Sequence, residues 1–278
     1  MRSSYKSFKR RIVWLSVVIT IAGIGLTTWF THYAKATSAY IPQDHALRRP
    51  DVYLFHAQGS SHAFIWLYGN DVAFWRAHQE LATLLASRGY DVVGFDARHF
   101  FDATSATGSA RDSLVARTIS TLVAHARHEF HDDTLPVIVA GHSLGADLAA
   151  WTAAHVTIPR LVGVVMLNPT RRSHLYATMR DRAFLGEPIE LGSYAAADVV
   201  RRIPPNVRVV VARGDHDSHN AGDTALVTAV VTSGHASDRT TAYRRIPFAG
   251  HSLRSLFVAG PVITHIMDDL VTSAHRTL

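Results

Sequence analysis

The stretch "VIVAGHSLGADLAAW", residues 137–151, places one serine between two glycines where a strand-like run changes into a helix-like run. The residues before Gly141 are mostly branched and apolar, which favours a buried strand. Those after Gly145 are rich in Ala and Leu, which favours a helix. A G-x-S-x-G pattern at such a junction is typical of the tight turn that exposes a nucleophilic serine. We therefore predict that Ser143 is a nucleophile, the alternative being a serine that only caps the helix.

Apolar runs and helical patterns alternate on both sides of this stretch, from residue 51 to the end of the chain. Strands are predicted over 52–57, 63–69, 91–97, 136–141, 161–169, 207–214 and 242–250, and helices over 71–90, 109–130, 144–156, 221–233 and 256–274. Near-continuous apolar strands followed by helices predict an α/β fold with a mostly parallel sheet covered on both faces. We expect one domain over 51–278, with 170–204 as a cap-like insertion.

Two further polar residues follow predicted strands, at the sheet edge where sites form in such folds. Asp217 lies in the run "RGDHDS" after one late strand, and His251 lies in the run "AGHSL" after the last one. A serine hydroxyl needs a base, and the base needs a third group to orient it. The chain order expected with this serine turn is Ser, acid, His. We predict a catalytic triad of Ser143, Asp217 and His251, with Asp215 as the alternative acid.

Backbone N–H groups near the serine are expected to bind an oxyanion. Leu144 begins the predicted helix directly after Ser143, so its N–H faces the site. The second donor in such folds comes from the loop after an early strand, which here is "LYGNDVAF". We assign it to the N–H of Asn70, although an ordinary Asn-Asp helix start would have the same sequence.

No cofactor or metal is predicted. The chain has no cysteine, which excludes disulfides and thiolate metal sites. His216, Asp217 and His219 are possible metal ligands, but the acid role already accounts for Asp217. That leaves the two histidines, and no third ligand is evident at a useful spacing in the sequence.

The formal charge of +6 does not indicate a nucleic-acid partner. Six of the 28 Lys and Arg residues lie within residues 1–36, which contain no acid. The remaining 22 basic residues equal the 22 acidic residues of the chain. The body of the protein is therefore neutral and is not expected to bind polyanions.

An uncharged, apolar segment, "IVWLSVVITIAGIGLTTWF" at residues 12–30, follows the basic residues of the N-terminus. At about 1.5 Å per residue, a helix of this length nearly spans a bilayer core of roughly 30 Å. The basic tail 1–11 is expected to stay in the cytoplasm, so the domain should lie outside it, joined through a linker over 31–50. We predict a single-pass anchor in a bacterial inner membrane, with the domain in the periplasm. The alternative is a signal peptide cleaved near Ala36, which would release a secreted protein.

Several stretches give the chain a resemblance to the α/β-hydrolase superfamily and, within it, to bacterial virulence proteins of the VirJ/AcvB type. They are "LYGNDVAFW", "GYDVVGFDARHFFDATSA", "VIVAGHSLGADLAAWTA", "VVMLNPTRRSHL…FLG" and "RGDHDS". The chain departs from those relatives in three places. They typically have Tyr at His142, Phe at Leu144 and a Gly-Asp-Gly-Gly-Trp-like run at "GNDVAFW". The resemblance implies an exported serine hydrolase, and some relatives act on aminoacylated lipids while others are linked to type IV secretion.

These observations together predict a membrane-anchored serine hydrolase that cleaves a carboxylic ester through an acyl-enzyme. The predicted tether makes a lipid or lipid-linked ester a plausible substrate class. Two alternatives remain at this point. One is a peptidase or thioesterase with the same triad, and the other is a non-catalytic accessory or binding protein of a secretion system on the same fold.

Overall fold

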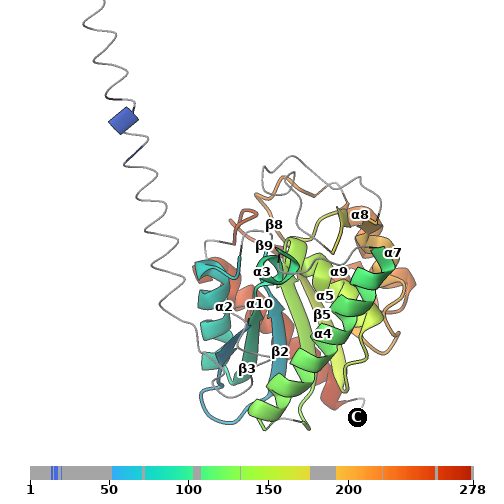
Figure 1. Ribbon diagram of the computed structural model, residues 1–278. Helices are drawn as coiled ribbons and strands as arrows, with labels where there is room; N and C mark the ends of the chain where they lie inside the picture. The colour runs from blue at the N-terminus through green and yellow to red at the C-terminus, as the bar shows by residue number, and fades with distance from the viewer. Residues whose placement is uncertain are drawn as a thin grey trace, which may run out of the picture. The chain divides into compact units, whose positions relative to one another are not determined.

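The structure is a computed structural model (Figure 1), and it describes residues 14, 16, 17, 20, 52–70, 73–102, 108–131, 133–175, 192–220, 222–253 and 256–276. The chain divides into two compact units, Met1–Ser38 and Ala39–Leu278. The predicted tail and linker, and most of the predicted membrane segment, lie outside the described residues. In the described part, no helix combines the length and the apolar character needed to cross a membrane.

One mixed sheet organises the second unit. Its strands are β1 (Val52–Phe55), β2 (Ala63–Tyr68), β3 (Tyr90–Phe95), β4 (Val137–His142), β5 (Leu161–Leu167), β8 (Arg208–Gly214) and β9 (Tyr243–Ile246). They are ordered β1-β3-β2-β4-β5-β8-β9. Only the edge strand β1 is antiparallel to its neighbour, and the other pairs are parallel. The predicted mostly parallel sheet is confirmed, and every strand except β1 brings its carboxyl end to the same edge.

The strands have buried residues on both sides because helices cover both faces of the sheet. The helices are α2 (Arg76–Ser87), α3 (Ala97–Asp102), α4 (Gly108–Glu129), α5 (Leu144–His155), α7 (Ala196–Val200), α8 (Asp223–Thr232), α9 (Arg239–Ala242) and α10 (Leu256–His275). Along β2, Trp66 and Tyr68 join the core that contains α4 and α5, whereas Ile65 and Leu67 join the core beneath α2 and α10. Figure 1 shows α4 lying across the sheet.

Several short elements differ from the sequence-based expectation, among them the helix α9, for which no helix was predicted. Residues 97–102 form the helix α3 after β3, and β9 ends at Ile246 rather than at residue 250. The flanks of the predicted insertion pair as a two-stranded ribbon of β6 (Arg172–Ser173) and β7 (Tyr194–Ala195). Residues 176–191, the centre of that predicted cap, lie outside the described part of the chain.

Candidate active site

The turn between β4 and α5 holds Ser143 in a strained backbone conformation. Its φ is 55° and its ψ is −122°, a combination that residues with a side chain seldom adopt. The two flanking glycines permit this turn. A Cβ on Gly141 would stand 2.0 Å from the carbonyl oxygen of Gly145, and a Cβ on Gly145 would stand 2.0 Å from that of Gly69. The local sequence therefore dictates a turn in which the serine leads into the helix from the carboxyl edge of the sheet.

The structure brings His251 and Asp217 to this serine. The Ser143 Oγ lies 3.0 Å from His251 Nε2, and His251 Nδ1 lies 3.0 Å from Asp217 Oδ2. A carboxylate only accepts hydrogen bonds, so Nδ1 carries the proton in this arrangement and Nε2 offers a lone pair to the serine hydroxyl. This is the geometry in which an imidazole removes a serine proton.

Of the two candidate acids, Asp217 is the one that contacts the histidine. Its side chain is fully buried. Asp215 is partly exposed and has its carboxylate 3.8 Å from the ring of His216. The backbone N–H of Asp217 donates to the carbonyl of Gly214, so a tight turn after β8 sets the position of the carboxylate.

The Asp217 carboxylate is held ionised by its partners. Burial by itself raises the pKa of this group, but hydrogen bonds from His251, the backbone N–H of His219 and Arg213 outweigh that effect. The pKa of Asp217 consequently lies well below its usual range. A charged acid is the state that stabilises an imidazolium beside it.

A buried arginine behind the acid was not anticipated from the sequence. Arg213, the penultimate residue of β8, donates from Nη1 to Asp217 Oδ2 at 2.6 Å. It also donates from Nε and Nη2 to the two oxygens of Asp223, at 3.0 and 2.5 Å. Tyr243 adds a hydrogen bond to Asp223. One guanidinium thus serves two carboxylates, which leaves this cluster with a net negative charge. No sequence motif distinguishes this arginine from the chain's many others.

The backbone of His251 is held by a second set of buried polar groups. His142 Nε2 lies 2.6 Å from the carbonyl oxygen of His251, and Asn168 Nδ2 donates to the same oxygen at 2.8 Å. On its other side, His142 Nδ1 lies 3.0 Å from Nε2 of His78. The N–H of Trp75 donates to Nδ1 of His78, so each histidine in this row is the tautomer with its proton on Nε2. The residue before Ser143 thereby positions the loop that carries His251.

Burial keeps both of these histidines neutral. It lowers the pKa of His142 to about 4, with a smaller contribution from nearby His251. Burial and the neighbouring His142 hold the pKa of His78 well below its usual value. A protonated ring would also lack the lone pair that each Nδ1 uses to accept a hydrogen bond.

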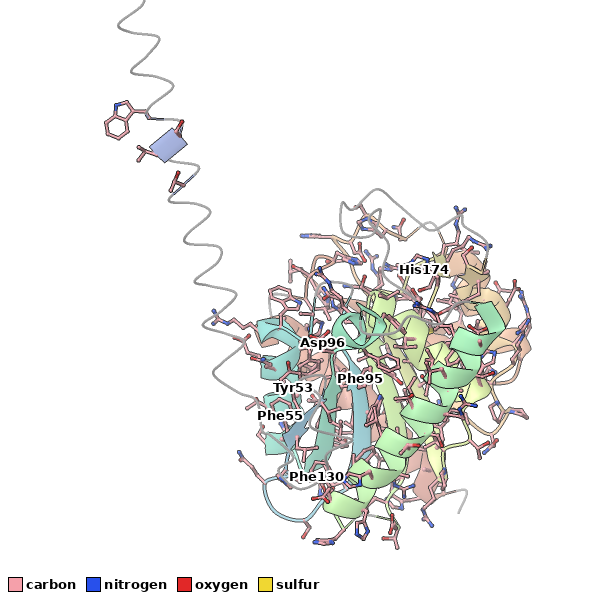
Figure 2. The ribbon with its side chains drawn as sticks, viewed as in Figure 1. Tyr53, Phe55, Phe95, Asp96, Phe130 and His174 are labelled. Atoms are coloured by element: carbon pink, nitrogen blue, oxygen red, sulfur yellow. The ribbon has the colours of Figure 1, made fainter. Side chains whose placement is uncertain are left out.

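The two predicted oxyanion donors belong to the first residue of α5 and to the loop after β2. Leu144 is the first residue of α5, and Asn70 follows Gly69, whose carbonyl oxygen faces Gly145. The Asn70 Oδ1 accepts a hydrogen bond from the N–H of Ala73, which shapes the loop after β2. The same loop is tied to Asp96, labelled in Figure 2 at the end of β3, by a bond from the N–H of Phe74. The side chain of Asn70 is thus committed to its own loop, as in an ordinary Asn-led turn.

His219, considered from the sequence only as a possible metal ligand, lies beside the predicted triad. Its Nδ1 lies 3.1 Å from Asp217 Oδ1, and its ring centroid lies 4.8 Å from that of His251. Among the described residues, Asp217, His219 and His251 form a group whose potential ligand atoms lie within 4.8 Å of one another. The sequence lacked a third ligand because His251 is distant along the chain.

The aromatic residues of α3 take a packing role. Phe100 and Phe101 are buried in the core that contains α4 and α5. Phe100 lies edge-on to Phe95, the last residue of β3. They support the carboxyl edge of the sheet from one face.

Comparison with known proteins places this arrangement in a family. The sequence model of the serine aminopeptidase S33 family matches residues 73–242, more than half of the chain. No curated protein matches the chain in sequence.

Among solved structures, the fold is similar to Est1E from Butyrivibrio proteoclasticus, with a TM-score of 0.56 and 14% identity over 80% of this chain and 94% of that one. It is also similar to a thermostable carboxyl esterase from Bacillus coagulans, with a TM-score of 0.57 and 11% identity over 79% of this chain and 94% of that one. A third similar structure is dipeptidyl peptidase 4 from Porphyromonas gingivalis, with a TM-score of 0.52 and 13% identity over 79% of this chain and 33% of that one. The predicted α/β-hydrolase fold is thus confirmed, and the chain belongs to the serine aminopeptidase S33 family of α/β hydrolases.

Proposed function

We propose that this protein is a serine hydrolase that cleaves a carboxylic ester through an acyl-enzyme. The observation that carries the proposal is the continuous row of hydrogen bonds from Ser143 through His251 to Asp217, built on a strained serine turn. The strained backbone of Ser143 and the row of buried hydrogen bonds both cost stability, and both serve to activate the serine hydroxyl.

In the first half of the reaction, Ser143 Oγ attacks the ester carbonyl carbon while His251 Nε2 takes the hydroxyl proton. The bond to the alcohol oxygen then breaks, and His251 returns that proton to the departing alcohol. In the second half, water attacks the acyl-serine, again giving a proton to His251, and the carboxylic acid is released as Ser143 regains its proton. Asp217 holds the Nδ1 proton of the ring throughout and stabilises the imidazolium.

The negative charge that develops on the carbonyl oxygen needs N–H donors. We propose the N–H of Leu144, which begins α5, and the N–H of Asn70, whose loop follows β2. The positions of these residues beside the serine turn support the assignment.

An ester is the proposed bond because an alcohol leaves more readily than an amine. Ester cleavage therefore needs fewer contacts between the substrate and a cap or binding subsite. The same fold is used by neighbours described as esterases and by one described as a peptidase. Peptide cleavage, which the family's description suggests, is the second candidate. Hydrolysis of aminoacyl-naphthylamides at a higher kcat/KM than the matching aminoacyl esters would favour it.

We also propose that the substrate is a lipid or aminoacyl-lipid ester and that the chain is anchored in the inner membrane with its domain in the periplasm. The uncharged segment 12–30, its preceding basic residues and the VirJ-type resemblance support this proposal. The full chain in vesicles should hydrolyse a long-chain ester faster than a short soluble one. Equal rates on the two would argue against a lipid substrate.

Fluorophosphonate labelling of the full chain tests the serine hydrolase proposal directly. We expect one modified residue, Ser143, with no labelling of Ser143→Ala and normal labelling of Ser60→Ala, a change at an exposed serine of a distant loop. If wild-type protein shown to be folded by circular dichroism stays unlabelled, the proposal is wrong. The accessory-protein alternative would then take its place.

A further inference from the structure

We propose that Asp217, His219 and His251 bind a divalent transition metal ion such as Zn²⁺, and that the bound ion switches the hydrolase off. Each of these side chains offers one ligand atom, and the three atoms lie within 4.8 Å of one another. The inhibitory part rests on the proposed function, whereas the binding part does not. Two imidazoles and a carboxylate, with water in the fourth position, are a ligand set that Zn²⁺ accepts.

The two oxygens of the Asp217 carboxylate have different surroundings, which decides where an ion would bind. Oδ2 faces Arg213 and His251, at 2.6 and 3.0 Å. Oδ1 faces His219, accepting from its backbone N–H at 3.0 Å and lying 3.1 Å from its Nδ1. A cation is therefore placed on the Oδ1 side, where it meets an imidazole rather than a guanidinium.

The spacing requires only a modest contraction. Metal–ligand bonds of about 2.1 Å in a tetrahedron set the ligand atoms about 3.4 Å apart. The three ligand atoms lie within 4.8 Å of one another, so no pair must approach by much more than 1 Å. The His219 side chain is 67% exposed and has room to rotate, whereas the buried Asp217 is fixed by its turn.

Charge and access also favour a cation. Arg213 carries one positive charge against the two carboxylates of Asp217 and Asp223, which leaves a net negative charge behind the site. His219 is exposed and His251 is partly exposed, so an ion reaches its ligands from solvent. The ion does not need to enter the protein interior.

Metal binding and catalysis exclude each other because both use the single lone pair of the neutral His251 imidazole. If the ion takes Nε2, that nitrogen no longer receives the proton of Ser143. If the ion takes Nδ1, the ring proton moves to Nε2, and the ring again has no lone pair for the serine. Either way the base is lost, whichever nitrogen is the ligand.

Binding is tested with Co²⁺ as the probe in the full chain carrying Ser143→Ala, which reports on the metal independently of catalysis. We expect the visible absorption of a four-coordinate Co²⁺ ion, saturating at one ion per chain and displaced by Zn²⁺. Adding His219→Gln should abolish this signal. Adding His216→Gln, which changes an exposed histidine of the same loop outside the ligand group, should preserve it.

Inhibition is tested in proteins that retain Ser143, by measuring their rate of fluorophosphonate labelling as Zn²⁺ is added. The labelling rate of each variant is divided by its own rate without metal. Wild type and His216→Gln should lose labelling together and regain it with a chelator. His219→Gln should need at least about tenfold more Zn²⁺, because a ligand has been removed. Equal sensitivity of the two variants, no Co²⁺ signal, or faster labelling with Zn²⁺ would overturn the proposal. An unlabelled metal-free wild type would overturn the inhibitory part together with the proposed function, while a Co²⁺ signal would still establish the site.

Discussion

Acid should destabilise this protein at a pH set by two of its buried histidines, His78 and His142. Burial lowers the pKa of His142 from its ordinary 6.5 to about 4 in the folded chain. Between these values the unfolded chain binds a proton that the folded chain does not, so stability falls as the pH falls. The contribution is fully present above pH 6.5 and is lost as the pH approaches 4.

The magnitude follows from the size of the shift. Each pKa unit corresponds to about 1.4 kcal/mol, so His142 alone removes about 2 kcal/mol of unfolding free energy between pH 6.5 and pH 5. For a chain of this size that amounts to about 4–8 °C in Tm. His78, whose pKa is also lowered, adds a loss in the same direction. Asp217 titrates outside this window, because its pKa lies below the usual carboxylate range and its contribution is lost only under stronger acid.

The assay is thermal unfolding of the full chain at pH 7 and pH 5, comparing wild type with His142→Gln. The variant should lose less Tm on acidification, by about 4–8 °C, because its glutamine does not titrate. His155→Gln is the matched control, since His155 is exposed, and it should behave as wild type. If His142→Gln and wild type lose the same Tm between the two pH values, the assigned cause of the acid sensitivity is wrong.

Two substitutions, each with a matched control variant, test the other parts of the site. Gly145→Ala should lower the unfolding free energy by about 3 kcal/mol or more and abolish labelling, because its Cβ would stand 2.0 Å from a carbonyl oxygen. Gly250→Ala, whose Cβ meets no atom within 4 Å, should keep wild-type stability in the same denaturant titration. Asp217→Asn should slow labelling on the order of 10⁴-fold by leaving the base in the wrong tautomer. Asp215→Asn should label at nearly the wild-type rate, and the reverse ranking would make Asp215 the acid.

Much of the fold could be read from local patterns. Apolar runs predicted the strands of the sheet, and the run 144–156 predicted α5 to within one residue. The helix α3 was missed because it is a single short segment with no full period of apolar spacing. The β6–β7 ribbon was missed because two-residue strands leave almost no pattern.

The individual members of the triad were predicted from where strands end and from chain order, without any knowledge of distance. The three side chains meet because parallel strands deliver their carboxyl ends to one edge of the sheet. The sequence-based reasoning left Asp217 and Asp215 as alternatives, since both follow the same strand. The turn after β8 distinguishes them, as it points Asp217 at His251 and leaves Asp215 beside His216.

The sequence by itself determined the elements that depend on neighbours in the chain: strand and helix periods, the glycine-flanked serine turn, and the order of the polar residues. Only the tertiary structure decided which distant groups meet. One example is Arg213, which lies between two carboxylates. A second is the contact of His78 with His142 behind the loop of His251. A third is His251, which joins His219 as a potential metal ligand. The physical reason is that these groups interact through space, across strands that the sheet brings together. Side-chain contacts of that kind leave no periodic trace along the chain.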